Sequence, residues 1–166
     1  MNIQRVLTKM FDLYSGDAKR IQHFTKVYTY ASYIGREEGI SEKEQAVLEI
    51  AAVVHDIGIH MCEEKYGECG GKLQEKEGPA IAKELLGELD ISADIIDRVC
   101  FLIGHHHTYN AVSIDWQILL EADFLVNGYE DCLSVKSLKA GYDKIFKTES
   151  GKKLFSSMYG KDVINA

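Results

Sequence analysis

The sequence AAVVHDIG at residues 51–58 ends a strongly apolar run with an imidazole and a carboxylate side by side. Ser41, followed three residues later by Glu44, has the pattern of a capping box at the start of a helix. Apolar residues then recur at helical spacing as far as Val54. The sequence therefore predicts a helix over 41–58 that places His55 and Asp56 at its end.

The rest of the chain also has helical rather than strand periodicity. Asp17 and Gly39 have the residue types of an N-cap and a stop, and they bound a predicted helix over 17–38. Ser92 is expected to be the N-cap of the helix over about 92–104. The apolar spacing predicts helices over about 79–87, 92–104, 113–127, 133–146 and 152–158. We therefore expect an all-α protein.

The segment 60–79 interrupts this periodicity. Gly67, Gly70 and Gly71 lie there among charged residues, and Pro79, the one proline of the chain, closes the segment. We expect a long connection that covers or lines a functional site. No repeat or linker divides the chain, so one domain over 1–166 is predicted, with a core of about 17–130 and further helices over 131–166.

Charge and composition exclude several classes of partner. With 19 Lys+Arg against 26 Asp+Glu, the net charge of −7 opposes binding to nucleic acid polymers and to anionic membranes. The apolar run Ile50 to Ile59 is about half the ~20 residues that a membrane-spanning helix needs. The four cysteines show no CxxC spacing, and no secretory signal is evident at the start. We expect a cytoplasmic protein with free thiols.

Four polar residues stand within otherwise apolar helical stretches: His23, His55, Asp56 and Asp123. Taken alone, His23 is more often a satisfied boundary residue, and Asp123 could equally cap a helix or pair with an arginine. Together they form a mixed nitrogen and oxygen set suited to a divalent ion such as Fe, Mn, Ni, Co or Zn. Such a site requires three distant helices to converge.

The order of these residues resembles that of a known family. His23 with Val27 and Ala31, then AAVVHDIG, then the EAD at 121–123 follow the His, His-Asp, Asp pattern of the HD-domain superfamily of metal-dependent phosphohydrolases, over about residues 17–130. The resemblance implies a compact helical bundle. It also implies that His23, His55, Asp56 and Asp123 bind a divalent metal ion.

A second set of family features is only partly present. In many two-ion members a histidine stands where this chain has Gln74, and paired histidines follow, which His105, His106 and His107 resemble. Spacing admits either His105 with His106 or His106 with His107. Gln74, His105 and His106 are therefore candidates for the substrate or for a second ion. The lysine that often follows the HDIG sequence is replaced by Ile59.

These features favour a metal-dependent phosphohydrolase that uses activated water to cleave a phosphate ester in a small phosphorylated metabolite or nucleotide. Asp56 is the expected catalytic residue, taking the proton from the water. Two alternatives stay open: a di-iron oxygenase of the same superfamily, and a non-catalytic nucleotide-binding module. The aromatic residues of 129–159 are expected in the core or at a contact between copies, so a homo-oligomer is left open.

Overall fold

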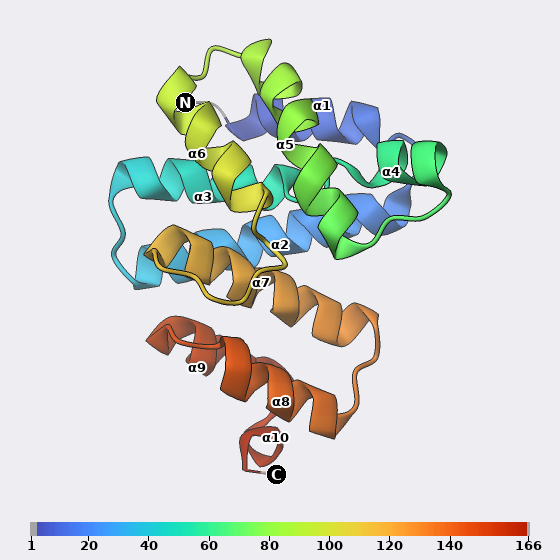
Figure 1. Cartoon of the computed structure of the whole chain (residues 1–166). Coiled ribbons are helices and arrows are strands. Elements are labelled where there is room, and N and C mark those ends of the chain that lie inside the picture. The colour runs from blue at the N-terminus through green and yellow to red at the C-terminus, as the bar shows by residue number, and fades with distance from the viewer. Residues whose placement is uncertain (1–2, 166) are drawn as a thin grey trace.

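The computed structural model describes residues 3–165, and these residues contain helices and no strands. The all-α class expected from the sequence is confirmed (Figure 1). The helices are α1 (Ile3–Leu13), α2 (Ala18–Glu37), α3 (Glu42–Val54), α4 (Ile59–Tyr66), α5 (Gly71–Gly87), α6 (Ala93–Ile103), α7 (Ile114–Glu130), α8 (Val135–Ile145), α9 (Glu149–Tyr159) and α10 (Lys161–Ile164).

Helix α3 forms the centre of the core. Every residue from Val47 to His55 is buried, and α1, α2, α6 and α7 pack around this helix. The stretch Glu42–Tyr66 is long and apolar enough to cross a membrane by length and composition, but 78% of its most apolar window is buried inside the protein. That burial is typical of a core helix, whose apolar residues are covered by neighbouring helices.

Local signals start and stop the central helices as predicted. The Asp17 side chain accepts a hydrogen bond from the Arg20 amide at 3.1 Å and caps α2. Ser41 and Glu44 form the reciprocal capping box of α3. Gly39 has a φ of +66°, a left-handed conformation that glycine adopts at little cost and that ends the helical path. α2 and α3 run in opposite directions, joined by a short turn (Figure 1).

The expected long connection over 60–79 is wrong. This segment folds into α4 and the first half of α5, separated by a short turn with Gly67 at a φ of +75°. Pro79 lies inside α5 rather than at its start. A glycine in this segment can serve close packing between helices instead of a loop. A Cβ added at Gly58 would lie 3.2 Å from the backbone of Gly78, inside α5. The glycines here permit close contact between helices as well as turns.

Helices α8 and α9 pack beside α7, below it in Figure 1, and α10 packs against α8 and α9. Phe155 and Phe146 are buried, with their ring centroids 5.0 Å apart, as the helical spacing of the tail predicted. Tyr129 is an exception, since 69% of it is exposed. The buried Glu121 accepts from the Thr148 amide at 2.9 Å at the start of α9, and this bond attaches the C-terminal helices to α7. The division into one domain stays a prediction.

We expect Gly58→Ala to lower the free energy of unfolding by about 1–3 kcal/mol, the usual cost of inserting a methyl group into a packed site. The backbone at Gly58 is right-handed helical, so the added Cβ is opposed only by the Gly78 backbone. Urea unfolding followed by circular dichroism measures the change. Gly87→Ala is the matched control, because it has open space and should be neutral or stabilising. Equal stability of the two variants would contradict the proposed contact.

Candidate metal centre

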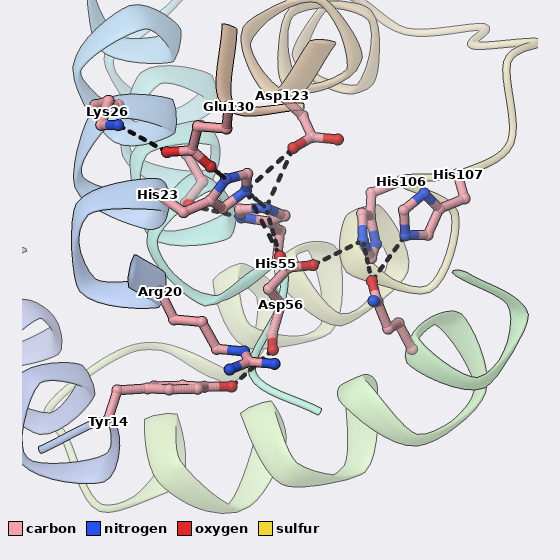
Figure 2. Close-up of polar contacts among 12 residues, drawn as sticks. Tyr14, Arg20, His23, Lys26, His55, Asp56, His106, His107, Asp123 and Glu130 are labelled. Atoms are coloured by element: carbon pink, nitrogen blue, oxygen red, sulfur yellow. Dashed lines mark hydrogen bonds and ion pairs between the residues drawn. The ribbon is translucent and has the colours of Figure 1, made fainter. Parts of the chain in front are cut away.

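Four side chains from three distant segments point toward one another beside the end of α3 (Figure 2). His23 comes from the second turn of α2, and His55 and Asp56 follow the last turn of α3. Asp123 comes from α7. The structure thus brings together all four residues expected to form the metal set. Their role as ligands is a proposal, taken up below.

Two imidazoles and one carboxylate form the most buried part of the site. The Nε2 atoms of His23 and His55 lie 3.1 Å apart. The Asp123 Oδ1 atom lies 3.3 Å from the His23 Nε2 and 3.5 Å from the His55 Nε2. Each side chain offers one atom to a space small enough for a single ion. We call His23, His55 and Asp123 the first group.

Asp56 lies between this group and a second one. Its Oδ2 atom is 3.5 Å from the Nε2 atoms of His23 and His55, and its Oδ1 atom is 3.4 Å from the His106 Nε2. The Asp56 backbone is anchored separately, because the Tyr14 hydroxyl donates to its carbonyl oxygen at 2.8 Å. The two carboxylate oxygens therefore face two different sets of nitrogen atoms.

The second group consists of Asp56, His106 and His107, with Gln74 beside it. The Gln74 Oε1 atom lies 2.7 Å from the His107 Nε2 and 3.3 Å from the His106 Nε2. The Glu75 carboxylate fixes this turn by accepting from the His107 amide at 3.0 Å. Gln74 thus contacts both rings at the position where the resemblance expects a third histidine.

His105 lies outside the site, which corrects its place among the candidates. Its Nδ1 lies 2.7 Å from the carbonyl oxygen of Phe101, and its ring stacks on the Phe101 ring at 4.4 Å. α6 ends at Ile103, and the turn that follows directs His106 and His107 inward and His105 outward. Of the two pairings that the spacing admits, the structure has His106 with His107.

Hydrogen bonds at Nδ1 orient the histidines for metal binding. The His55 Nδ1 donates to the Ala52 carbonyl at 2.9 Å, and the His106 Nδ1 donates to the Ile103 carbonyl at 2.6 Å. A neutral imidazole that donates from Nδ1 has its lone pair on Nε2. The lone pairs of these rings therefore point into the site. This donor set fits a divalent ion, because metal-bound histidines have such partners on the other nitrogen.

The charge state of the site without a metal follows from its burial. Burial opposes a charged His23, but the carboxylates of Asp123, Asp56 and Glu130 outweigh this effect and raise its pKa to about 9. Burial likewise opposes the charged forms of Asp56 and Asp123, yet the nearby histidines hold the pKa of both carboxyls far below the usual range. The carboxylates are ionised at neutral pH, and a proton on His23 occupies the place of a cation.

A cavity of about 210 Å³ opens onto His23 and Asp56. Lys19, Arg20 and Asn127 line it, and the Asp56 side chain is 21% exposed toward solvent. Larger surface cavities elsewhere, of about 430 and 400 Å³, contain none of the candidate ligands. Volume therefore does not identify the site, whereas the convergence of ligand atoms does.

Sequence reasoning missed Glu130, whose Oε2 atom lies 2.8 Å from the His23 Nδ1. Glu130 is seven residues after Asp123, two helical turns along the same face of α7, and this spacing is the signal that was available. His60, next to Ile59, lies outside the site: its Nε2 is 3.1 Å from the Asp17 carboxylate, and its ring is tilted against the Tyr14 ring at 4.2 Å.

A family model for the HD domain matches residues 20–131. The chain belongs to the HD domain family. A solved structure described as a predicted HD superfamily hydrolase, from an uncultured Thermotogales bacterium, is 23% identical, with a TM-score of 0.69 over 98% of this chain and 87% of that one. This likeness supports the bundle fold. No curated protein matches the chain. Membership of the family implies a metal-dependent hydrolase, consistent with the His and Asp groups.

The raised pKa of His23 predicts a pH-dependent stability of the metal-free protein. The charged ring stabilises the folded state fully below the unfolded pKa of about 6.5, and this contribution is lost as the pH rises toward 9. The free energy of unfolding should therefore fall by at most about 1.4 kcal/mol per pH unit in this window for one proton.

Urea unfolding of EDTA-treated protein between pH 6 and 9.5 measures this dependence. His23→Gln, which has no titrating ring, is the control and should show a flatter profile. Saturating Mn²⁺ should stabilise the wild type more at pH 9 than at pH 6.5, because the ion must displace the His23 proton from nearly every molecule at the lower pH and from about half of them at pH 9. Identical profiles for wild type and variant would contradict the assignment.

Proposed function

We propose that this HD-domain protein is a phosphohydrolase that cleaves a phosphate ester in a small phosphorylated metabolite or nucleotide. The observation that carries the proposal is the convergence of the His23 and His55 Nε2 atoms with the Asp56 and Asp123 carboxylates beside an open cavity. These four side chains would hold a divalent ion. Such an ion lowers the pKa of bound water and withdraws charge from phosphoryl oxygens.

Asp56 is the residue that this chain offers for proton transfer. Its carboxylate is ionised at neutral pH and partly exposed toward the cavity, so a water molecule can reach it. In the proposed reaction Asp56 orients the attacking water and accepts its proton. The His106 Nε2 atom, 3.4 Å from the Asp56 Oδ1, is the next acceptor. In this proposal His106, His107 and Gln74 contact the phosphate rather than a second ion.

The opening of the cavity supports an anionic substrate. Arg20 is held at its rim by ion pairs with Asp17 at 2.6 Å and Glu63 at 2.5 Å. Lys19 also lines the cavity and forms no ion pair within residues 3–165, so its ammonium group is free to contact a phosphate. The negative charge elsewhere on the protein is screened beyond about 10 Å at 0.1 M salt. We place this activity in the cytoplasm, on a substrate that is neither nucleic acid nor membrane.

The position of Asp56 between two groups favours a second candidate, a di-iron oxygenase, because a bridging carboxylate can hold two ions. The neutral amide of Gln74 counts against it, since this residue replaces an imidazole in the second group. Elemental analysis and a visible absorption spectrum of aerobically purified protein separate the two functions. A phosphatase screen against a panel of metabolites, with Mn²⁺, Ni²⁺ or Co²⁺ added, tests the first. Turnover there would also exclude the non-catalytic module.

Asp56→Ala should lower the rate of phosphate release at least about 100-fold, the usual contribution of a positioned acid or base. The loss of its two oxygens also removes a contact to each group. Phosphate release in the metabolite screen, with the metal added in excess, measures the effect. His105→Ala is the control, because His105 belongs to the same histidine run but stacks on Phe101. Full turnover by the Asp56 variant would remove this residue from the mechanism.

Gln74→His should raise the number of ions bound per chain from one to two at saturating Mn²⁺. An imidazole at this position would complete a second set of ligands with Asp56, His106 and His107, in place of a weakly binding amide. Equilibrium dialysis with elemental analysis gives the stoichiometry, and Gln74→Ala, which adds no ligand, should stay at one. Two ions in the wild type, or one in Gln74→His, would contradict the role given to Gln74.

A further inference from the structure

His23 differs from the other inward-facing histidines in its environment. His55 and His106 follow the ends of α3 and α6, where the last carbonyls of a helix have no amide partner within the helix. These carbonyls accept the Nδ1 protons of the two rings. His23 lies in the second turn of α2, inside the helix, where the carbonyls are used by the helix itself. Its Nδ1 therefore needs a partner from elsewhere in the protein.

Glu130 supplies that partner from the end of α7. Its Oε2 atom lies 2.8 Å from the His23 Nδ1, and its Oε1 atom lies 2.7 Å from the Lys26 Nζ (Figure 2). Lys26 is one turn from His23 on the same face of α2, so both ends of the carboxylate are held by one helix. The Glu130 side chain is only 13% exposed. The contact is thus fixed in position and largely shielded from water.

The negative charge of Glu130 stands at an electrostatically unfavourable position and requires a compensating positive charge. It is the last residue of α7, where the free carbonyls give the helix end a partial negative charge that disfavours a carboxylate. Lys26 offsets this charge, and the His23 N–H provides a second favourable contact. Asp131, the next residue, borders the same cavity and contacts none of the candidate ligands. Of these two neighbouring acidic residues, Glu130 is therefore the one held against a candidate ligand.

We propose that Glu130, held by Lys26, is a positioning residue that keeps the proton of His23 on Nδ1 and directs the Nε2 lone pair to the metal. The proposal rests on the metal site of the proposed function. A carboxylate that accepts the Nδ1 proton is ionised. It therefore makes the imidazole Nε2 a stronger electron-pair donor to a metal than a neutral backbone carbonyl acceptor would. Glu130 thereby sets how tightly the first group binds its ion.

Titration with Co²⁺ alone, followed by visible absorption, tests the proposal in the full chain. Glu130→Ala should bind Co²⁺ about 10- to 100-fold more weakly than the wild type, the usual effect of losing such a partner. Its absorption bands should also shift. Glu130→Gln should recover part of the affinity, because its amide carbonyl still accepts from Nδ1 without the charge. Asp131→Asn is the matched control and should leave the affinity and the spectrum unchanged.

Nitrogen NMR of the zinc-loaded protein provides a second measurement. The wild type should show a proton on the His23 Nδ1 in slow exchange with water, and Glu130→Ala should show faster exchange. Wild-type affinity and spectrum in Glu130→Ala would overturn the inference. If that variant does not fold, Glu130→Gln decides, and unchanged affinity there overturns it equally. A wild type that binds no Co²⁺ would instead overturn the proposed function.

Discussion

Donor atoms that repel one another are held together in the interior of this protein, and the packing of the helices has to overcome that repulsion. Two imidazole nitrogens lie 3.1 Å apart with the Asp123 carboxylate beside them, although burying such groups without a cation costs several kcal/mol. The apolar faces of α2, α3 and α7 hold these donors together, because the same helices bury the core residues. A bound cation or proton relieves the repulsion, so the folded state itself favours occupation of the site.

Close approach of two backbones extends the site beyond these three helices. Gly58 follows the metal motif and lies against Gly78, which brings α5 next to the end of α3. The same helix then places Gln74 against His106 and His107. A side chain at Gly71 would collide with the His107 ring, so this helix also limits where the ring can lie. The second group is therefore a result of helix packing as much as of the histidine run.

Helices α2, α3 and α6 to α9 and the first group could be predicted because their signals are local, whereas α1, α4 and α10 were not among the predicted helices. The capping box of Ser41 and the spacing of α2 are contained in short windows, and the order of His23, His55, Asp56 and Asp123 is fixed along the chain. The start of α5 could not be predicted, since glycine-rich composition indicates turns equally well as close packing.

The directions of single side chains could not be predicted from the sequence for a different reason. Neighbouring residues on a helical path differ by about 100° in direction, so the path of the turn after α6 decides whether His105 or His107 faces inward. The role of Glu130 depends on a contact between α2 and α7, and in the sequence only the spacing of Glu130 from Asp123 points to that contact. Such contacts require the relative placement of two helices, which periodicity leaves open.

The acidic character of the chain is consistent with a phosphorylated substrate if the divalent ion binds first and the phosphate second. Asp56, Asp123 and Glu130 are ionised at neutral pH, and Lys26 and the protonated His23 ring offset two of them. Without a cation this region repels a phosphate and attracts a divalent ion. Once an ion is bound, its charge and that of Lys19 face the cavity, so the region becomes favourable to an anion. In the proposed function the negative site is therefore a requirement, because it ensures that the ion binds before the substrate.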